Sequence, residues 1–237
     1  HGGYLRLLFA ARDDARLGAM LLGDAEAQAA PISGFPVMAG GGSDLACQEI
    51  AATRRVFVFS GPDGMVRQTI LSATGVPGKQ TVIPLAEGIL VDVAAMEVVE
   101  RGAIDLAITA SEGRSGLMLF HLSDAGSFTP AGAVADGPKT CLSGISDLAS
   151  LVIGPRSFVL VASALEDGLT VLELGEGGQA TPVDTLSAAN GLPINGPQAL
   201  MTVSTAGQHY VLVASTLSSS LTMVRVTPEG VLFEASH

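Results

Sequence analysis

Three aspartates and one glutamine stand at corresponding places in this chain, each at the start of an apolar run. Asp44, Asp92 and Asp147 occur in the related tetrapeptides SDLA, VDVA and SDLA, and Gln198 precedes the last such run. Carboxylate and amide oxygens are the ligands that Ca²⁺ and Mg²⁺ prefer in proteins. A fold that brings the four positions together would make a Ca²⁺ site, with the aspartates as metal ligands and Gln198 as an additional ligand-binding group.

A structural role is the alternative for each of these aspartates. Asp side chains in turns accept hydrogen bonds from nearby backbone N–H groups, and the sequence leaves both roles open. Other chemistry is poorly supported, because no two histidines have the spacing of a zinc site. No GxSxG elbow surrounds any serine, so a serine nucleophile is not indicated.

An internal repeat in the sequence indicates the strands that must position these residues. Residues 158–174, FVLVASALEDGLTVLEL, have close counterparts at 209–226 and 105–122 and a weaker one at 56–71. The serines that close the first apolar run of each copy are 51, 52 and 52 residues apart: Ser60, Ser111, Ser163 and Ser215. A fixed period of this length is typical of repeat architectures.

Each full repeat contains four strand-like segments separated by Gly, Pro, Asp and Ser, and the second segment is continuously apolar, as in a strand buried on both faces. This pattern predicts an all-β fold, a β-propeller of four-stranded blades with about five blades in a single domain, 1–237. A β-sandwich and a parallel β-helix are the alternatives. The blade units are 1–39, 40–88, 89–142, 143–195 and 196–237.

The first unit lacks one strand, which leaves three arrangements open: a five-bladed ring, part of a larger ring such as one of seven blades, or an open arc closed by assembly. Because the first residues already resemble the middle of a repeat, we expect a segment of a longer protein. In a propeller the first strand of each blade lines the central channel, so Asp44, Asp92, Asp147 and Gln198 are expected at one channel mouth.

The net charge of the chain limits the classes of partner that we expect. The net charge is −11, from 23 acidic and 12 basic residues, which argues against nucleic acid and anionic membrane surfaces. No run of 18 apolar residues is present, so no membrane span is expected.

Cys47 and Cys141 have no CxxC spacing, and we expect two buried free thiols rather than a disulfide.

A family resemblance is carried by the repeat motifs Phe158–Ser163, Gly168–Leu174, Tyr210–Ser215, Leu221–Val226 and Ser146–Ala149. They resemble the repeats of lactonase-like (YVTN-type) propellers, and they are similar to propeller regions of secreted alphaproteobacterial proteins with hemolysin-type calcium-binding repeats. The resemblance implies a secreted or cell-surface protein. The GGxGxDxUx nonapeptide of such calcium-binding repeats does not occur in this sequence.

These observations favour a non-catalytic binding or scaffolding module that contacts a protein or glycan through a propeller rim. The turns between the second and third segments, such as Asp167-Gly168, are expected to be two-residue hairpin loops on that rim. His121 aligns with Glu173 and Arg225, so we expect it to face solvent. The alternatives are a lactonase-like hydrolase acting at the channel mouth, with the three aspartates as its only candidate groups, and a structural subunit of a larger assembly.

Overall fold

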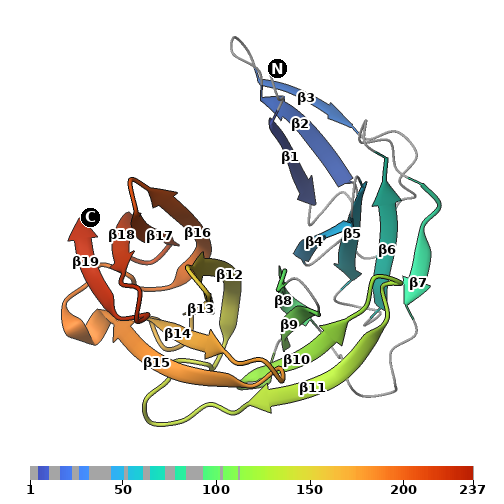
Figure 1. Cartoon of the computed structure of the whole chain (residues 1–237). Coiled ribbons are helices and arrows are strands. Elements are labelled where there is room, and N and C mark those ends of the chain that lie inside the picture. Colours follow the sequence, from blue (N-terminus) through green and yellow to red (C-terminus); the bar gives the residue numbers. More distant parts are fainter. Residues whose placement is uncertain are drawn as a thin grey trace. The chain divides into compact units, whose positions relative to one another are not determined.

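The computed structural model describes residues 5–10, 17–22, 27–31, 44–50, 53–60, 65–72, 78–83, 93–101, 104–111 and 113–236. They belong to two compact units, His1–Val93 and Ala94–His237. Each unit is a series of antiparallel sheets whose strands follow one another in chain order (Figure 1).

The first unit contains one three-stranded and one four-stranded sheet. The three-stranded sheet consists of β1 (Leu5–Ala10), β2 (Leu17–Leu22) and β3 (Ala27–Pro31). The four-stranded sheet consists of β4 (Asp44–Ile50), β5 (Thr53–Ser60), β6 (Met65–Leu71) and β7 (Thr81–Ile83). In the latter, Arg55 is buried and its Nη1 donates to Oε1 of the buried Gln48 over 2.9 Å, which pairs two polar side chains inside the sheet.

The second unit contains three four-stranded sheets. The first consists of β8 (Val93–Val99), β9 (Asp105–Ser111), β10 (Leu117–Leu122) and β11 (Phe128–Val134). The second consists of β12 (Ile145–Ile153), β13 (Arg156–Ser163), β14 (Gly168–Leu174) and β15 (Ala180–Ser187). The third consists of β16 (Pro197–Thr205), β17 (Gln208–Ser215), β18 (Ser220–Val226) and β19 (Leu232–Ser236).

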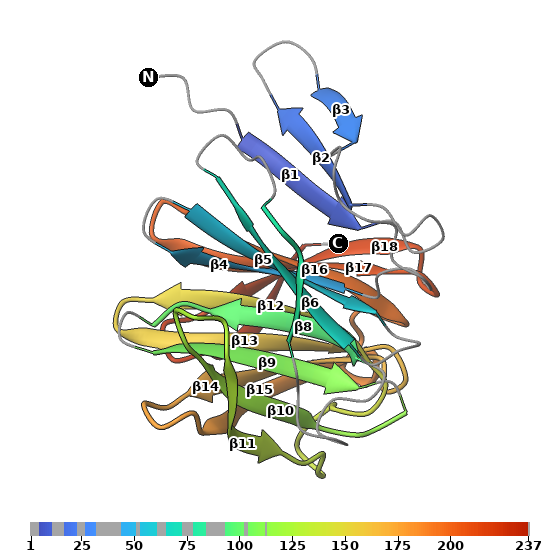
Figure 2. The ribbon, with the colours of Figure 1, turned by 90° about the vertical axis from the view of Figure 1, so that its right-hand side faces the viewer.

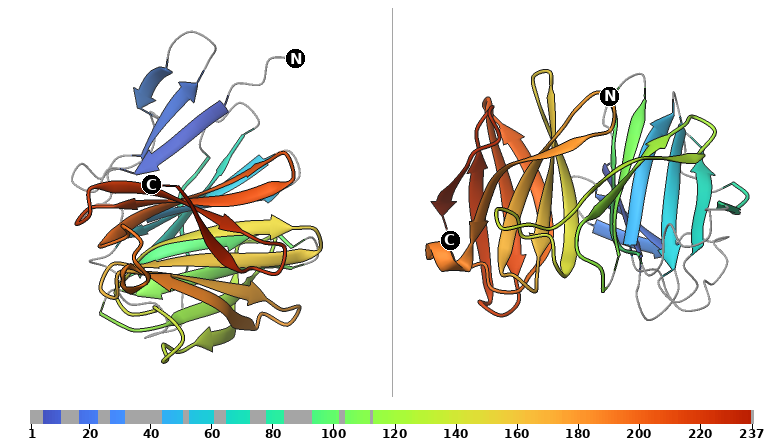
Figure 3. Two further views of the ribbon diagram at one scale, coloured as in Figure 1. Left: turned by 90° about the vertical axis from the view of Figure 1, so that its left-hand side faces the viewer. Right: turned by 90° about the horizontal axis from the view of Figure 1, so that it is seen from below.

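These sheets are the blades of a β-propeller, so the all-β, four-strand repeat predicted from the sequence is confirmed. The described residues contain no α-helix and one 3₁₀ turn, Ala188–Asn190. Neighbouring blades of the second unit stack face to face (Figures 2 and 3). The stacking explains why the second segment of each repeat is continuously apolar, because an inner strand between two blades has no solvent-facing side.

Strand β13 illustrates this double burial. Val159 and Val161 pack into the core shared with β8–β11, while Phe158 and Leu160 pack into the core shared with β16–β19. All four side chains are completely buried. The alternation follows from the two-residue period of a strand, and it makes β12–β15 the most deeply buried blade of the second unit.

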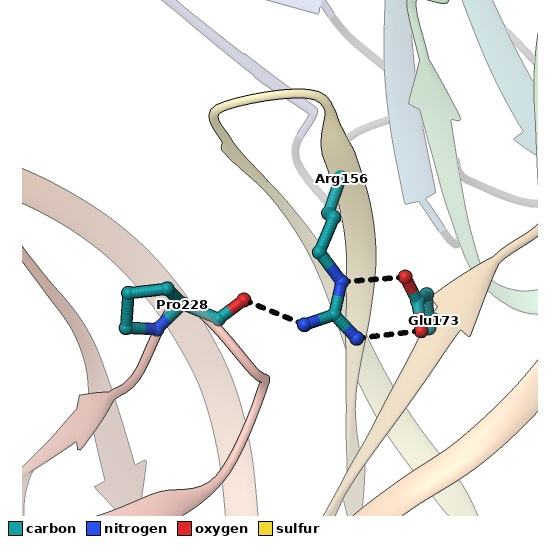
Figure 4. A network of polar contacts seen from close by, with 3 residues as sticks. All are labelled: Arg156, Glu173 and Pro228. Atoms are coloured by element: carbon teal, nitrogen blue, oxygen red, sulfur yellow. Dashed lines mark hydrogen bonds and ion pairs between the residues drawn. The ribbon is translucent and has the colours of Figure 1, made fainter.

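Polar contacts at the blade margins add to these apolar cores. Arg156 forms a bidentate ion pair with Glu173, with N–O distances of 2.6 and 2.7 Å, and donates to the Pro228 carbonyl of the next blade over 2.9 Å (Figure 4). Arg101 similarly donates to the Gly175 carbonyl, from the β8–β9 connection to the β14–β15 turn. In both cases an arginine of one blade holds the outer turn of the following blade.

The hairpin loops between β13 and β14 and between β17 and β18 are longer than the sequence suggested. Ser163 pairs with Gly168 and Ser215 pairs with Ser220, so each loop has four residues. Asp167 and Ser219 take positive φ angles of 51° and 50° at the end of these loops. The expected two-residue turn is therefore wrong in length, because the left-handed residue closes a wider loop.

Candidate functional sites

Asp147 lies at the β-bulge near the start of β12. Its Oδ1 accepts a hydrogen bond from the Leu148 N–H over 2.9 Å, and its Oδ2 accepts one from the Leu200 N–H over 2.6 Å. Burial raises the pKa of Asp147, and the two backbone hydrogen bonds oppose that rise. The bond from Leu148 is of the local kind that the sequence left open for this residue. The bond from Leu200 also ties β12 to β16.

A second carboxylate lies on the neighbouring inner strand. Glu97, on β8, accepts a hydrogen bond from the Ser150 N–H over 3.0 Å, and Thr202 on β16 donates to the Ser150 carbonyl over 3.0 Å. Burial raises the pKa of Glu97, and the negative charge of Asp147 contributes in the same direction. Inner strands of three blades are thus joined through two carboxylates with raised pKa values.

Glu97 was not predicted from the sequence. In the sequence it is a single acidic residue inside the apolar run AAMEVV. The simpler interpretation of such a residue is a solvent-exposed position on a strand. Perturbed carboxylates in close electrostatic contact are frequent in functional sites and also in structural networks. The backbone hydrogen bonds to both Asp147 oxygens favour the structural role here.

The structure describes the other predicted Ca²⁺ ligands only in part. Gln198 is exposed at the bulge between Pro197 and Ala199. Asp44 opens β4, where its backbone pairs with that of Phe59, but its side chain lies outside the described residues. Asp92 lies outside them entirely, and the described part of the chain contains no group of three His, Cys, Asp or Glu suited to a metal. The Ca²⁺ site at Asp44, Asp92 and Asp147 stays a prediction.

The two carboxylates give the protein a testable pH dependence. Their folded-state pKa values are raised, so the native chain binds protons that the unfolded chain releases. Their contribution to stability is therefore fully present below the ordinary carboxyl pKa and is lost as the pH rises through the raised values. We expect Glu97→Gln, which keeps the acceptor for Ser150 and removes the charge, to raise the melting temperature at pH 7 by several degrees, since about 1 kcal/mol corresponds to roughly 2–4 °C in a chain of this size.

Thermal unfolding between about pH 7 and pH 5 measures this effect. Lowering the net negative charge also reduces general repulsion, so the control is Glu176→Gln, which removes an equal charge from an exposed position. The expected gain at pH 7 is larger for Glu97→Gln than for Glu176→Gln and shrinks on acidification. Identical melting curves for the two variants across this range would contradict the account.

A different surface is formed by the β13–β14 and β17–β18 hairpin loops. Leu165 is 73% exposed and Leu217 is 77% exposed, and the two leucines occupy corresponding places 52 residues apart in consecutive blades. We call the loops Ala164–Asp167 and Thr216–Ser219 the hairpin-tip surface. Large aliphatic side chains this exposed, repeated at the same position, are candidates for direct contact with a partner.

Acidic and hydroxyl side chains hold these loops in place. Glu166 Oε2 accepts from the Ser143 N–H over 2.8 Å, and Asp167 Oδ1 accepts from the Gly196 N–H over 2.7 Å. In the next blade, Ser218 donates to the Pro193 carbonyl over 2.9 Å. Each tip is therefore fixed to a blade-connecting loop, so its leucine is presented on a supported backbone.

Glycines in the connecting loops allow this arrangement. Gly144 and Gly196 have φ angles of 63° and 59°. A Cβ on Gly144 would lie 2.5 Å from Leu165 Cβ, and one on Gly196 would lie 2.8 Å from Leu217 Cγ. Only glycine adopts this positive φ without strain and also leaves room for the leucine side chain beside it.

Three further expectations concern single residues. Cys141 is a buried free thiol whose pKa is raised by burial and by nearby carboxylates, Glu166 first, whereas the Cys47 side chain lies outside the described residues. His121 is half-buried, and a Cβ on Gly178 of the next blade would lie 3.2 Å from its Cε1. The prediction that His121 faces solvent is wrong to that extent. Ser163 donates to the Ser143 carbonyl, which agrees with a strand-end role.

Among the residues that the structure describes, no helix is long and apolar enough to cross a bilayer.

Comparison with known proteins gives matches in structure and none in sequence. No protein-family model matches the chain, and no curated protein matches it significantly. An exo-β-1,3-galactanase from Phanerochaete chrysosporium is similar with a TM-score of 0.59 and 13% identity, over 81% of this chain and 49% of the galactanase. A protein from Lactobacillus plantarum is similar with a TM-score of 0.63 and 17% identity, over 99% of this chain and 67% of that one.

A functionally unknown protein from Desulfotomaculum acetoxidans is similar with a TM-score of 0.58 and 14% identity, over 98% of this chain and 67% of that protein. At these identities the matches show the propeller fold alone. The chain spans about half the length of the galactanase that it matches.

Proposed function

We propose that the chain is a non-catalytic binding or scaffolding module of a secreted or cell-surface protein, and that it contacts a protein or glycan through the hairpin-tip surface. The observation that carries this proposal is the pair of exposed leucines, Leu165 and Leu217, at equivalent tips of adjacent blades. Their loops are held by hydrogen bonds to the blade connections. A supported loop pays little ordering entropy on binding, which favours recognition at such a surface.

The chemistry of this surface indicates what it would bind. Burial of one leucine contributes about 1.5–3 kcal/mol relative to exposure, so two leucines contacting one ligand account for a substantial part of a micromolar affinity. Backbone N–H groups hold the Glu166 and Asp167 carboxylates beside them. A peptide segment with apolar side chains, or the apolar face of a sugar ring, fits such a surface.

Selection from a displayed peptide library and a glycan array tests the proposal. Ligands recovered with the parent chain should lose affinity by at least about tenfold for the Leu165→Asp, Leu217→Asp double variant, which follows from about 1.4 kcal/mol per factor of ten. The matched control is Leu221→Asp, at a leucine outside the hairpin tips that is 60% exposed. Ligands that bind the double variant and the parent equally well would overturn the proposal.

Hydrolysis at the inner strands is the second candidate function. It is supported by the two carboxylates with raised pKa values, Glu97 and Asp147, and by fold similarity to a galactanase. A raised carboxyl pKa is what a general acid requires at neutral pH. The substrates to test are β-1,3-galactan oligosaccharides and a lactone panel. Turnover by the parent that Asp147→Asn and Glu97→Gln abolish would establish hydrolysis at this site. Absence of turnover by the parent would rule out this second function.

The predicted cation site is a separate proposal within the same module. If Asp44, Asp92 and Asp147 bind Ca²⁺, about 1 mM Ca²⁺ should raise the melting temperature of the parent, since binding to the native state stabilises it. The triple Asp→Asn variant should lack that rise. Absence of any Ca²⁺ effect on the parent excludes the site without affecting the hairpin-tip proposal.

A further inference from the structure

The β9–β10 hairpin loop forms a third tip beside the hairpin-tip surface, and this tip carries an arginine. Arg114 occupies the repeat position that Glu166 and Ser218 occupy in the two following blades. Ser115 Oγ donates to Ser143 Oγ over 3.0 Å, and the Ser143 N–H donates to Glu166 Oε2 over 2.8 Å. The tip of the β8–β11 blade is therefore joined to the β13–β14 loop through a single residue of the blade connection.

The side chain of Arg114 differs from its counterparts in what it contacts. Glu166 and Ser218 each form a hydrogen bond to the blade connection beside their loop. Arg101 and Arg156 each donate to a backbone carbonyl of the following blade. Arg114 is exposed, and within the described part of the chain its guanidinium has no hydrogen bond or ion pair. Its N–H donors therefore remain for a ligand.

A hydroxyl group on the blade connection adds to these donors. Because Ser115 Oγ donates to Ser143 Oγ, the hydrogen of the Ser143 hydroxyl is left over, and no described residue accepts it. A planar guanidinium with a nearby hydroxyl is a donor set suited to a carboxylate. The next residue, Gly144, lies so close to Leu165 that a Cβ on it would be 2.5 Å from Leu165 Cβ. A carboxylate held by Arg114 and Ser143 would thus lie beside an exposed leucine.

The contacts between tips and connections fix the order of three side chains along the rim: Arg114, Leu165 and Leu217. The series continues past Leu165 because Asp167 accepts from the Gly196 N–H, and Leu217 packs on Gly196. Stacked sheets lie about 10 Å apart, so we expect neighbouring tips to be separated by about that distance. A peptide in the polyproline II conformation advances about 9 Å in one turn of three residues, so every third side chain would meet a tip.

We propose that this rim binds a peptide segment in which an acidic residue is followed, three and six residues later, by large aliphatic residues. The inference rests on the proposed function and specifies its partner. The acidic side chain binds Arg114 and Ser143, and the two aliphatic side chains contact Leu165 and Leu217. An acidic glycan would supply a carboxylate but has no aliphatic side chains for the two leucines, which favours a peptide.

The charge of the chain sets the range over which this contact acts. The net charge of −11 opposes the approach of an anion. A bidentate guanidinium–carboxylate pair forms at about 2.8 Å, whereas exposed charges further away than about 8 Å are largely screened at physiological ionic strength. Glu166 and Asp167, the carboxylates of the neighbouring tip, each accept a backbone N–H. The acidic residue of the ligand is therefore recognised by the local donors at Arg114.

Fluorescence anisotropy of the full chain with short synthetic peptides tests the proposal. The acidic probe is the labelled peptide Glu-Pro-Pro-Leu-Pro-Pro-Leu, whose prolines favour the polyproline II conformation. The comparison probes are the same peptide with Gln in place of Glu and the spacing isomer Glu-Pro-Leu-Pro-Leu-Pro-Pro. We expect the parent to bind the acidic probe about tenfold more tightly than either, the usual scale for a hydrogen bond to a charged group.

Three variants assign this preference to residues. Arg114→Gln should bind the acidic probe and its glutamine analogue equally well. The matched control is Lys139→Gln, which removes an equal charge from an exposed residue whose carbonyl accepts from Thr185, and it should keep the preference. The Leu165→Asp, Leu217→Asp double variant should bind none of the probes. Circular dichroism checks that each variant folds.

The outcomes separate this inference from the proposed function. Equal binding of the three probes by the parent, or a preference that Arg114→Gln retains, would overturn the acidic segment while hairpin-tip binding still stands. Tighter binding of an oligogalacturonate than of the acidic probe would replace the peptide by an acidic glycan. If no probe binds the parent, this inference is wrong and the library selection decides the proposed function. Binding that survives in the double leucine variant would contradict both.

Discussion

Phe158→Ala should lower the free energy of unfolding by about 3–5 kcal/mol, the usual loss when a buried phenylalanine is truncated. The Phe158 ring is completely buried between two blades. A Cβ on Gly230 would lie 2.7 Å from its Cε1, so the outer turn of the next blade packs directly on the ring. Because both blades close on this side chain, the remaining cavity cannot collapse without moving one of them.

The matched variant is Tyr210→Ala, at the same position of the last blade. Tyr210 is only half-buried, so its truncation should cost about 1 kcal/mol or less, as expected for a partly exposed site. Urea denaturation of the two variants and the parent measures both losses. Equal losses for the two variants would show that the two blade faces are not covered differently.

Gly168→Ala should lower the free energy of unfolding by about 1–3 kcal/mol through overpacking. Gly168 begins β14, and its added Cβ would lie 2.8 Å from Cys141 Cβ and closer still to the sulfur. Its backbone conformation is open to other residues, so lack of space alone accounts for the glycine. The blade connection that carries Cys141 would have to move away from the strand.

A double-mutant cycle separates this clash from a general effect of the substitution. Cys141→Ala removes the sulfur that the new methyl group would meet, so the double variant should recover part of the loss. Gly137→Ala is the control, since the nearest atom to its Cβ would be Thr140 Oγ1 at 3.9 Å. Since alanine keeps its own Cβ, additive losses in the cycle would mean that the Cys141 sulfur is not the obstacle.

The fold was predictable from the sequence because its signals are local and repeated. The run Phe158–Ser163 is apolar at every position up to its closing serine, and four such runs share one period. A single strand of this kind is ambiguous, but the repetition together with intervening turn residues leaves few architectures. Loop length was not predictable, because Asp167 at the end of the β13–β14 loop takes a left-handed conformation that the sequence does not reveal.

The candidate sites were less accessible to sequence reasoning. Glu97 acquires its role only when Ser150, on the next blade, donates to it, and no local pattern encodes that contact. Asp147 was found, but its hydrogen bond to the Leu200 N–H comes from a strand 53 residues away. Leu165 and Leu217 did carry a signal, since each is a large apolar residue followed by two polar turn residues and they share the repeat period.

The most direct test of the hairpin-tip surface as a binding site is a methyl NMR titration. A chain labelled at leucine methyl groups is titrated with a peptide or glycan selected as described above. We expect the signals of Leu165 and Leu217 to shift together and to saturate, while the signals of buried Leu160 and of Leu221 on β18 stay unchanged. Saturable shifts confined to Leu221 or to leucines beside Asp147, with none at the hairpin tips, would contradict the proposed binding surface.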